Sequence, residues 1–112
     1  MPEEYTDLVD ELKATGIPFE EYRWKTAPAG SYGVVRLDFE AGSLDGDDGK
    51  QYRSFQGSVD LYFRMLADRD TLLPLIEEAL TEVCGTCWSL NQMQHEHSTG
   101  YFHAEWVFEV EG

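Results

Sequence analysis

The sequence predicts an α+β domain in the order α-β-β-β-α-β-β, with both helices on one face of a mainly antiparallel or mixed sheet. Two segments place apolar residues at the i, i+3, i+4, i+7 spacing of an amphipathic helix. Five further segments alternate apolar and polar residues, as half-buried strands do, and clusters of Gly, Pro and Asp separate them. With 112 residues, the chain has the size of one domain, residues 1–112.

The first predicted element is a short helix near the N-terminus. Gly16 ends it and Pro18 follows, which is a common order at a helix C-terminus. Its apolar stripe consists of Tyr5, Leu8, Val9 and Leu12.

Three strands are expected next, over residues 19–25, 32–40 and 52–65. In the third, Gly57 interrupts the alternation and predicts a bend or a bulge. Residues 41–50 are the most polar stretch and are expected to form a hairpin tip.

The hairpin tip carries Asp45, Asp47 and Asp48, which raises the question of a calcium loop. The spacing of these carboxylates does not match an EF-hand, and a strand follows where a helix would be required. The sequence therefore predicts a solvated tip.

A second helix and two strands complete the chain. Asp70 is the expected N-cap, and Pro74 is expected in the first turn. Strands are predicted over residues 86–97 and 101–111, joined by a tight turn at 98–100. The buried stripe of the helix is expected to be Leu72, Ile76, Ala79, Leu80 and Val83. On the last strand, Phe102, Ala104, Trp106, Phe108 and Val110 are expected on the core face, and His103, Glu105 and Glu109 on the other.

The formal net charge is −14, from 22 acidic and 8 basic residues. A field of this sign repels phosphate backbones and anionic lipid, so the sequence argues against a conventional nucleic-acid reader. No apolar run is long enough to span a membrane, and the N-terminus does not resemble a signal peptide. The acidic surface then serves solubility, matches a basic partner, or lines a channel through which DNA passes without adhering.

Cys84 and Cys87 form the one recognised chemical spacing, a Cys-x-x-Cys pair. The pair closes a helix, with Gly85 as its expected C-cap, and opens a strand, so the helix dipole does not favour a reactive thiolate. Together with His95 and His97 it could supply zinc ligands, but these histidines lie towards the far end of the following strand. The sequence holds no catalytic motif and no phosphate-binding loop, and we expect no enzyme activity and no cofactor.

Several strings, in order along nearly the whole chain, resemble the tail-completion proteins (tail-terminator or head–tail joining) of tailed phages and prophages. They are residues 12–18 (LKATGIP), 27–28 (AP), 32–35 (YGVV), 48–52 (DGKQY), 59–63 (VDLYF), 88–91 (WSLN) and 99–110 (TGYFHAEWVFEV). None is a catalytic signature. The Cys-Gly-Thr-Cys turn departs from the pattern of the family.

The resemblance implies a virion subunit that forms a homo-oligomeric ring, commonly a hexamer, at the head-proximal end of the tail tube. The implied partners are further copies of the chain, the tail tube protein and the head–tail connector, in the host cytoplasm during assembly and in the tail or neck afterwards. Contacts between these partners are expected at the hairpin tip and at exposed aromatics. The interface residues expected on this basis are Asp45, Asp47, Asp48, Tyr52, Tyr62 and Trp88.

Two other functions remain open from the sequence. An acidic DNA mimic would occupy the basic groove of a DNA-binding protein and would need carboxylates spaced like phosphates. A small metal-binding module would be built on the two cysteines and the histidines. Elemental analysis of the purified protein tests the latter.

Overall fold

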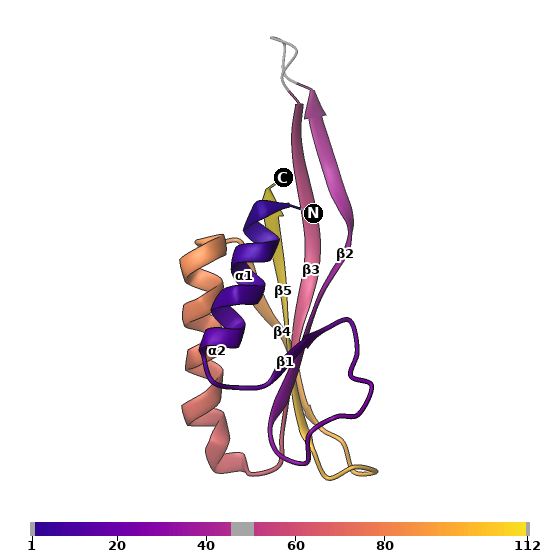
Figure 1. The fold of residues 1–112 in the computed structure, drawn as a ribbon, viewed down its shortest axis with the longest axis vertical. Helices are drawn as coiled ribbons and strands as arrows, with labels where there is room; N and C mark the ends of the chain where they lie inside the picture. The colour runs from indigo at the N-terminus through magenta and orange to yellow at the C-terminus, as the bar shows by residue number, and fades with distance from the viewer. Residues whose placement is uncertain (1, 46–50, 112) are drawn as a thin grey trace.

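The structure, a computed structural model, describes residues 2–45 and 51–111. Its order of elements and its α+β class are those predicted from the sequence. A five-stranded sheet has the strand order β1-β2-β3-β5-β4, and two helices cover one of its faces (Figure 1). The elements are α1 (Glu3–Ala14), β1 (Phe19–Glu21), β2 (Tyr32–Asp45), β3 (Gln51–Phe63), a 3₁₀ turn (Leu66–Asp68), α2 (Arg69–Cys84), β4 (Trp88–His95) and β5 (Phe102–Glu111).

The sheet is mixed, because β1 runs parallel to β2 while the other neighbours are antiparallel. A parallel pair needs a long connection, and the loop of residues 22–31 supplies it. The last strand in sequence, β5, lies between β3 and β4, so the C-terminal strand occupies the interior of the sheet.

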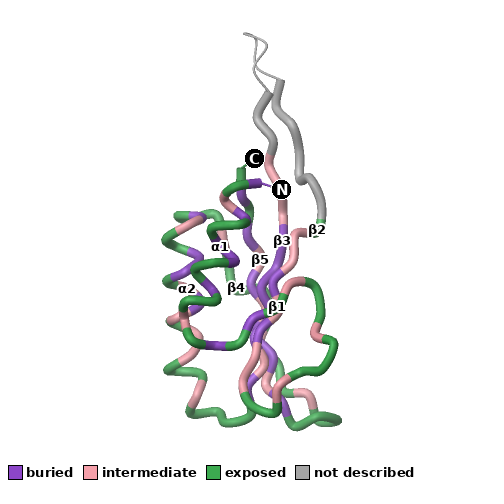
Figure 2. Tube along the Cα trace, viewed as in Figure 1, coloured by how far each residue is buried: buried purple, intermediate pink, exposed green. Residues whose placement is uncertain are grey.

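The core lies between the helices and the sheet, where the predicted stripes meet (Figure 2). All four apolar residues of the α1 stripe are buried. On α2, Ile76, Ala79 and Leu80 are buried, but Leu72 and Val83 are only half-buried and lie at the margin. Trp106 of β5 is fully buried and donates a hydrogen bond from Nε1 to Glu77 of α2 at 3.0 Å.

The first strand is shorter than predicted. β1 ends at Glu21 and not at residue 25, because Tyr22 adopts a φ of 66° and the Arg23 amide donates to the Glu21 carbonyl. The chain then leaves the sheet plane. Trp24 turns back and donates from Nε1 to the Gly33 carbonyl at 2.9 Å.

The β2–β3 hairpin is longer than predicted. The expectation that residues 41–45 lie in a loop was wrong, since β2 continues to Asp45, which pairs with Gln51 of β3. Cross-strand pairing outweighs the polar composition of this stretch. The hairpin extends past the other strands and makes the molecule 52 Å long. The predicted tip residues Asp47 and Asp48 lie outside the described residues.

The bend predicted at Gly57 is a bulge of the neighbouring strand. The register of β2 shifts between Leu37 and Phe39, opposite Gly57. A Cβ on Gly57 would collide with the Arg36 carbonyl and with the ring of Phe108. Gly57 therefore permits a close approach of two strands and an aromatic side chain.

The second helix begins earlier than predicted. The 3₁₀ turn runs directly into α2, whose N-cap is Asp68, so the expectation of Asp70 as N-cap was wrong. Asp70 instead lies in the first turn, and Pro74 falls one turn further in than expected. The predicted Gly85 cap is confirmed: its φ is 61° and its amide donates to Thr81.

The last two strands, β4 and β5, are slightly shorter at their ends than residues 86–97 and 101–111. Within the described residues, no helix is both long and apolar enough to cross a bilayer.

Candidate functional site: the open face of the sheet

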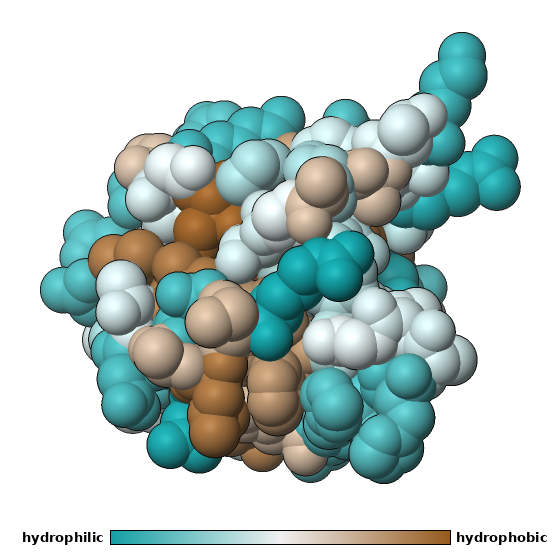
Figure 3. Space-filling model, turned by 90° about the horizontal axis from the view of Figure 1, so that it is seen from below, coloured by the Kyte–Doolittle hydropathy of each residue, from teal (hydrophilic) through white to brown (hydrophobic). Residues whose placement is uncertain are grey.

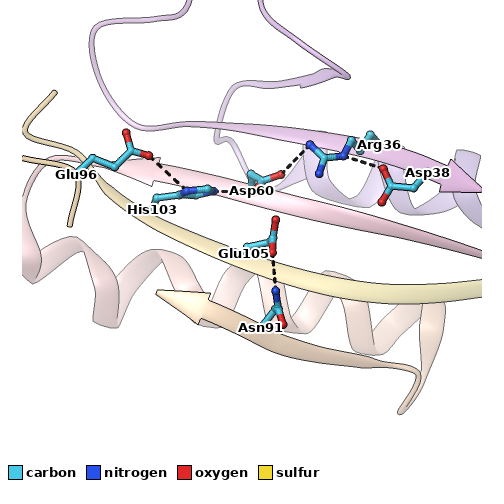
Figure 4. A network of polar contacts seen from close by, with 7 residues as sticks. All are labelled: Arg36, Asp38, Asp60, Asn91, Glu96, His103 and Glu105. Atoms are coloured by element: carbon cyan, nitrogen blue, oxygen red, sulfur yellow. Dashed lines mark hydrogen bonds and ion pairs between the residues drawn. The ribbon is translucent and has the colours of Figure 1, made fainter. Parts of the chain in front are cut away.

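The sheet face away from the helices carries a network of polar side chains from β2, β3 and β5 (Figure 4). Strand register brings them together: Arg36 lies opposite Ser58, and Asp60 lies opposite Glu105. Tyr62 lies opposite His103. We call this set of residues the open-face network.

At its centre, His103 and Asp60 form a buried ion pair. Nε2 of His103 lies 2.6 Å from Oδ1 of Asp60, and the side chains are 11% and 6% exposed. Nδ1 of His103 lies 3.5 Å from Glu96, and the ring stacks on Tyr62 at a centroid distance of 4.3 Å. Burial by itself lowers the pKa of His103, but the hydrogen bond that its ring donates to Asp60, with the charges of Asp60, Glu96 and Glu105, raises it above the ordinary value.

The remaining partners of the open-face network surround this pair. Arg36 contacts Asp38 at 2.8 Å and Asp60 at 3.8 Å, so it places a positive charge beside the buried carboxylate. Asn91 of β4 donates to Glu105 at 2.7 Å. A network with most members satisfied fixes the relative positions of four strands.

Aromatic side chains continue this face below the network. Tyr32 stacks on Tyr62 at 4.9 Å, and Tyr101 meets both edge-on. The guanidinium of Arg64 lies 4.2 Å above the Tyr101 ring. Tyr101 also donates to the carbonyl of Ala29 at 3.0 Å, which ties the loop of residues 22–31 across the lower part of the face.

The predicted interface residues do not form one surface. Tyr62 belongs to the open face. Its burial and the nearby charge of Asp60 raise the pKa of its hydroxyl to about 12. Trp88 lies on the helix side of β4 and donates to Thr81 of α2 at 3.2 Å. Asp45 and Tyr52 lie in the extended β2–β3 hairpin, where the structure describes the backbone and not these side chains; Asp47 and Asp48 are outside the described residues.

Sequence reasoning missed the buried pair. His103 was expected on the strand face opposite the core, with Glu105 and Glu109, and it lies there, but its burial against Asp60 was not predicted. The two residues are 43 positions apart, and their contact depends on the pairing of β3 with β5.

The four candidate zinc ligands fall into two groups. Cys84 is the last residue of α2 and is buried, which raises the pKa of its thiol to about 12, whereas Cys87 is exposed. His95 and His97 lie with ring centroids 5.0 Å apart at the far end of β4, roughly 25 Å away at ~3.3 Å per residue. Among residues 2–45 and 51–111, no three metal-ligating side chains gather.

Two further surfaces have a marked chemistry. Grooves along the outside of the helices are lined by acids of both, including Glu11, Glu78 and Glu82. At the lower end of the molecule, Met65 and Leu66 are 64% and 51% exposed, and Figure 3 shows apolar surface at this end between polar side chains.

No protein-family model and no curated protein matches the sequence. A solved structure does match in fold: a chain of the "Virion of native gene transfer agent (GTA) particle" superimposes with a TM-score of 0.52 at 12% identity. The match covers 96% of this chain and 94% of that chain. The two chains therefore share a fold over nearly their whole lengths.

Proposed function

We propose that the protein is a structural subunit of a phage-like virion, and that it forms a ring at the head-proximal end of the tail tube. The observation that carries this proposal is the end-to-end likeness in fold to a chain of the gene transfer agent virion. The strings that resemble tail-completion proteins support the same conclusion. The ring, commonly a hexamer, ends tube polymerisation and presents a docking face to the head–tail connector.

The mechanism is binding without chemistry. Copies of the chain, the tail tube protein and the connector are the partners. The open-face network suits a contact surface, because its hydrogen-bonded polar groups, buried at the centre and half-buried around it, tolerate both water and a covering protein. Its rigidity gives a subunit with a fixed shape, which a closed ring requires.

We further propose that the acidic outer side of the helices faces the lumen of the ring. Glu11, Glu78 and Glu82 would repel DNA that passes through it. The double variant Glu78→Lys/Glu82→Lys should assemble but retard DNA ejection, and added salt should relieve the delay. Glu20→Lys, at an exposed acid on β1 away from the helices, is the control and should leave ejection unchanged.

The experiment that tests the function is negative-stain electron microscopy of particles made with this gene deleted. We expect overlong tubes, or heads and tails left unjoined, and the wild-type gene supplied in trans should restore normal particles. Infectious particles of normal length without the gene would overturn the proposal. The acidic inhibitor function would then be tested next, by salt-sensitive binding to DNA-binding proteins.

A further inference from the structure

The outer edge of β4 carries no charged side chain, although the molecule as a whole is strongly acidic. In a chain of which 27% of residues are charged, residues 84–95 include no Asp, Glu, Lys or Arg. β4 is the last strand of the sheet, so one of its edges has no strand beside it within the described residues. Natural edge strands are usually protected by charged side chains or by proline. β4 has neither.

Backbone hydrogen bonds show which groups of β4 point outward. The carbonyl of Cys87 accepts from Glu109, and the amide of Glu96 donates to Tyr101, so both ends of the strand bond to the chain on the β5 side. Along β4, the backbone N–H and C=O groups of successive residues point alternately towards β5 and away from it. The register shift between Leu90 and Gln92 inserts one extra residue into this alternation. Four residues of β4 therefore have both groups pointing away from β5. These residues are Trp88, Leu90, Met93 and His95.

The same four residues place their side chains on the helix side of the sheet. They lie opposite Phe108, Trp106, Ala104 and Phe102 of β5 in turn, all on the core face. Trp88 and Met93 pack against the core, whereas Leu90 is 44% exposed at the margin. In the part of the chain that the structure describes, this edge thus combines backbone groups that pair with no neighbouring strand and a leucine side chain that is partly exposed.

We propose that β4 pairs with β4 of a second copy of this chain in an antiparallel, two-fold contact. In the register that pairs the whole strand, Trp88 lies opposite the partner's His95, and Leu90 lies opposite the partner's Met93. Without a bulge this register would oppose residues from different faces of the sheet. The bulge at Asn91 shifts by one residue the alternation of side chains between the two sheet faces. Paired residues on either side of the two-fold axis then place their side chains on the same face.

The chemistry of the paired side chains fits this register. On the helix side, Leu90 and Met93 of both copies form one apolar cluster, which covers Leu90. On the open side, Ser89 meets the partner's Gln94. The outward groups supply up to about eight backbone hydrogen bonds.

The self-complementary register of β4 favours a second copy as the occupant. Two molecules of net charge −14 repel one another, but residues 84–95 bring no charged side chain of their own into this contact. An edge contact of eight residues is small, so the dimer is expected to be weak and concentration-dependent. A two-fold contact closes at two copies, so this contact is separate from the head-to-tail contact of a ring and does not rest on the proposed function.

Sedimentation velocity over a series of protein concentrations tests the proposal. We expect wild type to shift towards a species of twice the monomer mass as concentration rises, and Leu90→Lys to remain monomeric. Leu66→Lys, which places the same charge on an equally exposed leucine away from β4, should associate like wild type. A monomeric wild type at all concentrations, or a Leu90→Lys variant that still dimerises, would overturn the proposal.

Amide hydrogen exchange gives a second readout on unmodified protein. Raising the concentration should slow exchange at the amides of Trp88, Leu90, Met93 and His95. Dimerisation that leaves these amides unchanged would rule out the β4 contact, even if Leu90→Lys fails to fold.

Discussion

Breaking the buried pair of His103 and Asp60 should lower the free energy of unfolding. Replacing His103 with leucine keeps a similar volume but leaves the carboxylate of Asp60, 6% exposed, without its closest partner. Removing one member of a buried pair costs about 3–5 kcal/mol. Arg36, at 3.8 Å, partly compensates, so we expect the lower end, ~3 kcal/mol.

Urea denaturation measures this loss. At a slope of about 1.5 kcal/mol/M, a loss of ~3 kcal/mol lowers the midpoint by about 2 M. The double variant His103→Leu/Asp60→Leu should recover most of the loss, because no buried charge is then left unpaired. A His103→Leu midpoint within about 0.3 M of wild type would refute the assignment of a structural ion pair.

The same pair predicts how stability changes with pH. The pKa of His103 is raised in the folded protein above its ordinary value of 6.5, so the folded state binds the proton more tightly than the unfolded state. The stabilisation is complete below about pH 6.5 and is lost as pH rises through the folded pKa. His103→Leu should remove this decline from the urea midpoints, and His97→Gln, at an exposed histidine, should retain it. An equal decline in wild type and His103→Leu would contradict the reasoning.

Three further predictions concern single positions. Gly57→Ala forces the backbone of β2 or an aromatic ring to move and should lower the free energy of unfolding by about 1–3 kcal/mol. Gly30→Ala is the control, because its Cβ would meet nothing within 4 Å. An equal effect of both variants in thermal denaturation would count against the close approach at Gly57. In thiol labelling of native protein, Cys87 should react and Cys84 should react only on unfolding; two fast-reacting thiols would show that Cys84 is not buried. Tyr101→Phe removes the hydrogen bond to the loop of residues 22–31 and should speed proteolysis there, so an unchanged cleavage rate would show that the loop is held by other contacts.

The helices were predictable because their signal is local. The stripe of α1 repeats within twelve residues, and each of its apolar positions is buried. Gly85 was recognisable as a helix cap from its position alone. The start of α2 was misplaced because a 3₁₀ turn has no distinct sequence signature and merges with the helix that follows.

The strands were less predictable because their limits depend on their neighbours. β2 extends through a polar stretch because β3 pairs with it as far as Gln51. β1 stops early because Tyr22 takes a backbone conformation that is rare for a tyrosine. The open-face network could not be derived from one sequence, since it requires the register of three strand pairs at once.

The position of β5 in the interior of the sheet has a consequence for biosynthesis. β5 joins β3 on one side and β4 on the other, and it is the last of the five strands to leave the ribosome. Until it emerges, β4 has no neighbour and α1 and α2 have an incomplete surface to cover. The nascent chain therefore cannot complete its sheet until β5 has emerged, and during that interval the uncharged segment at residues 84–95 is open to chaperones.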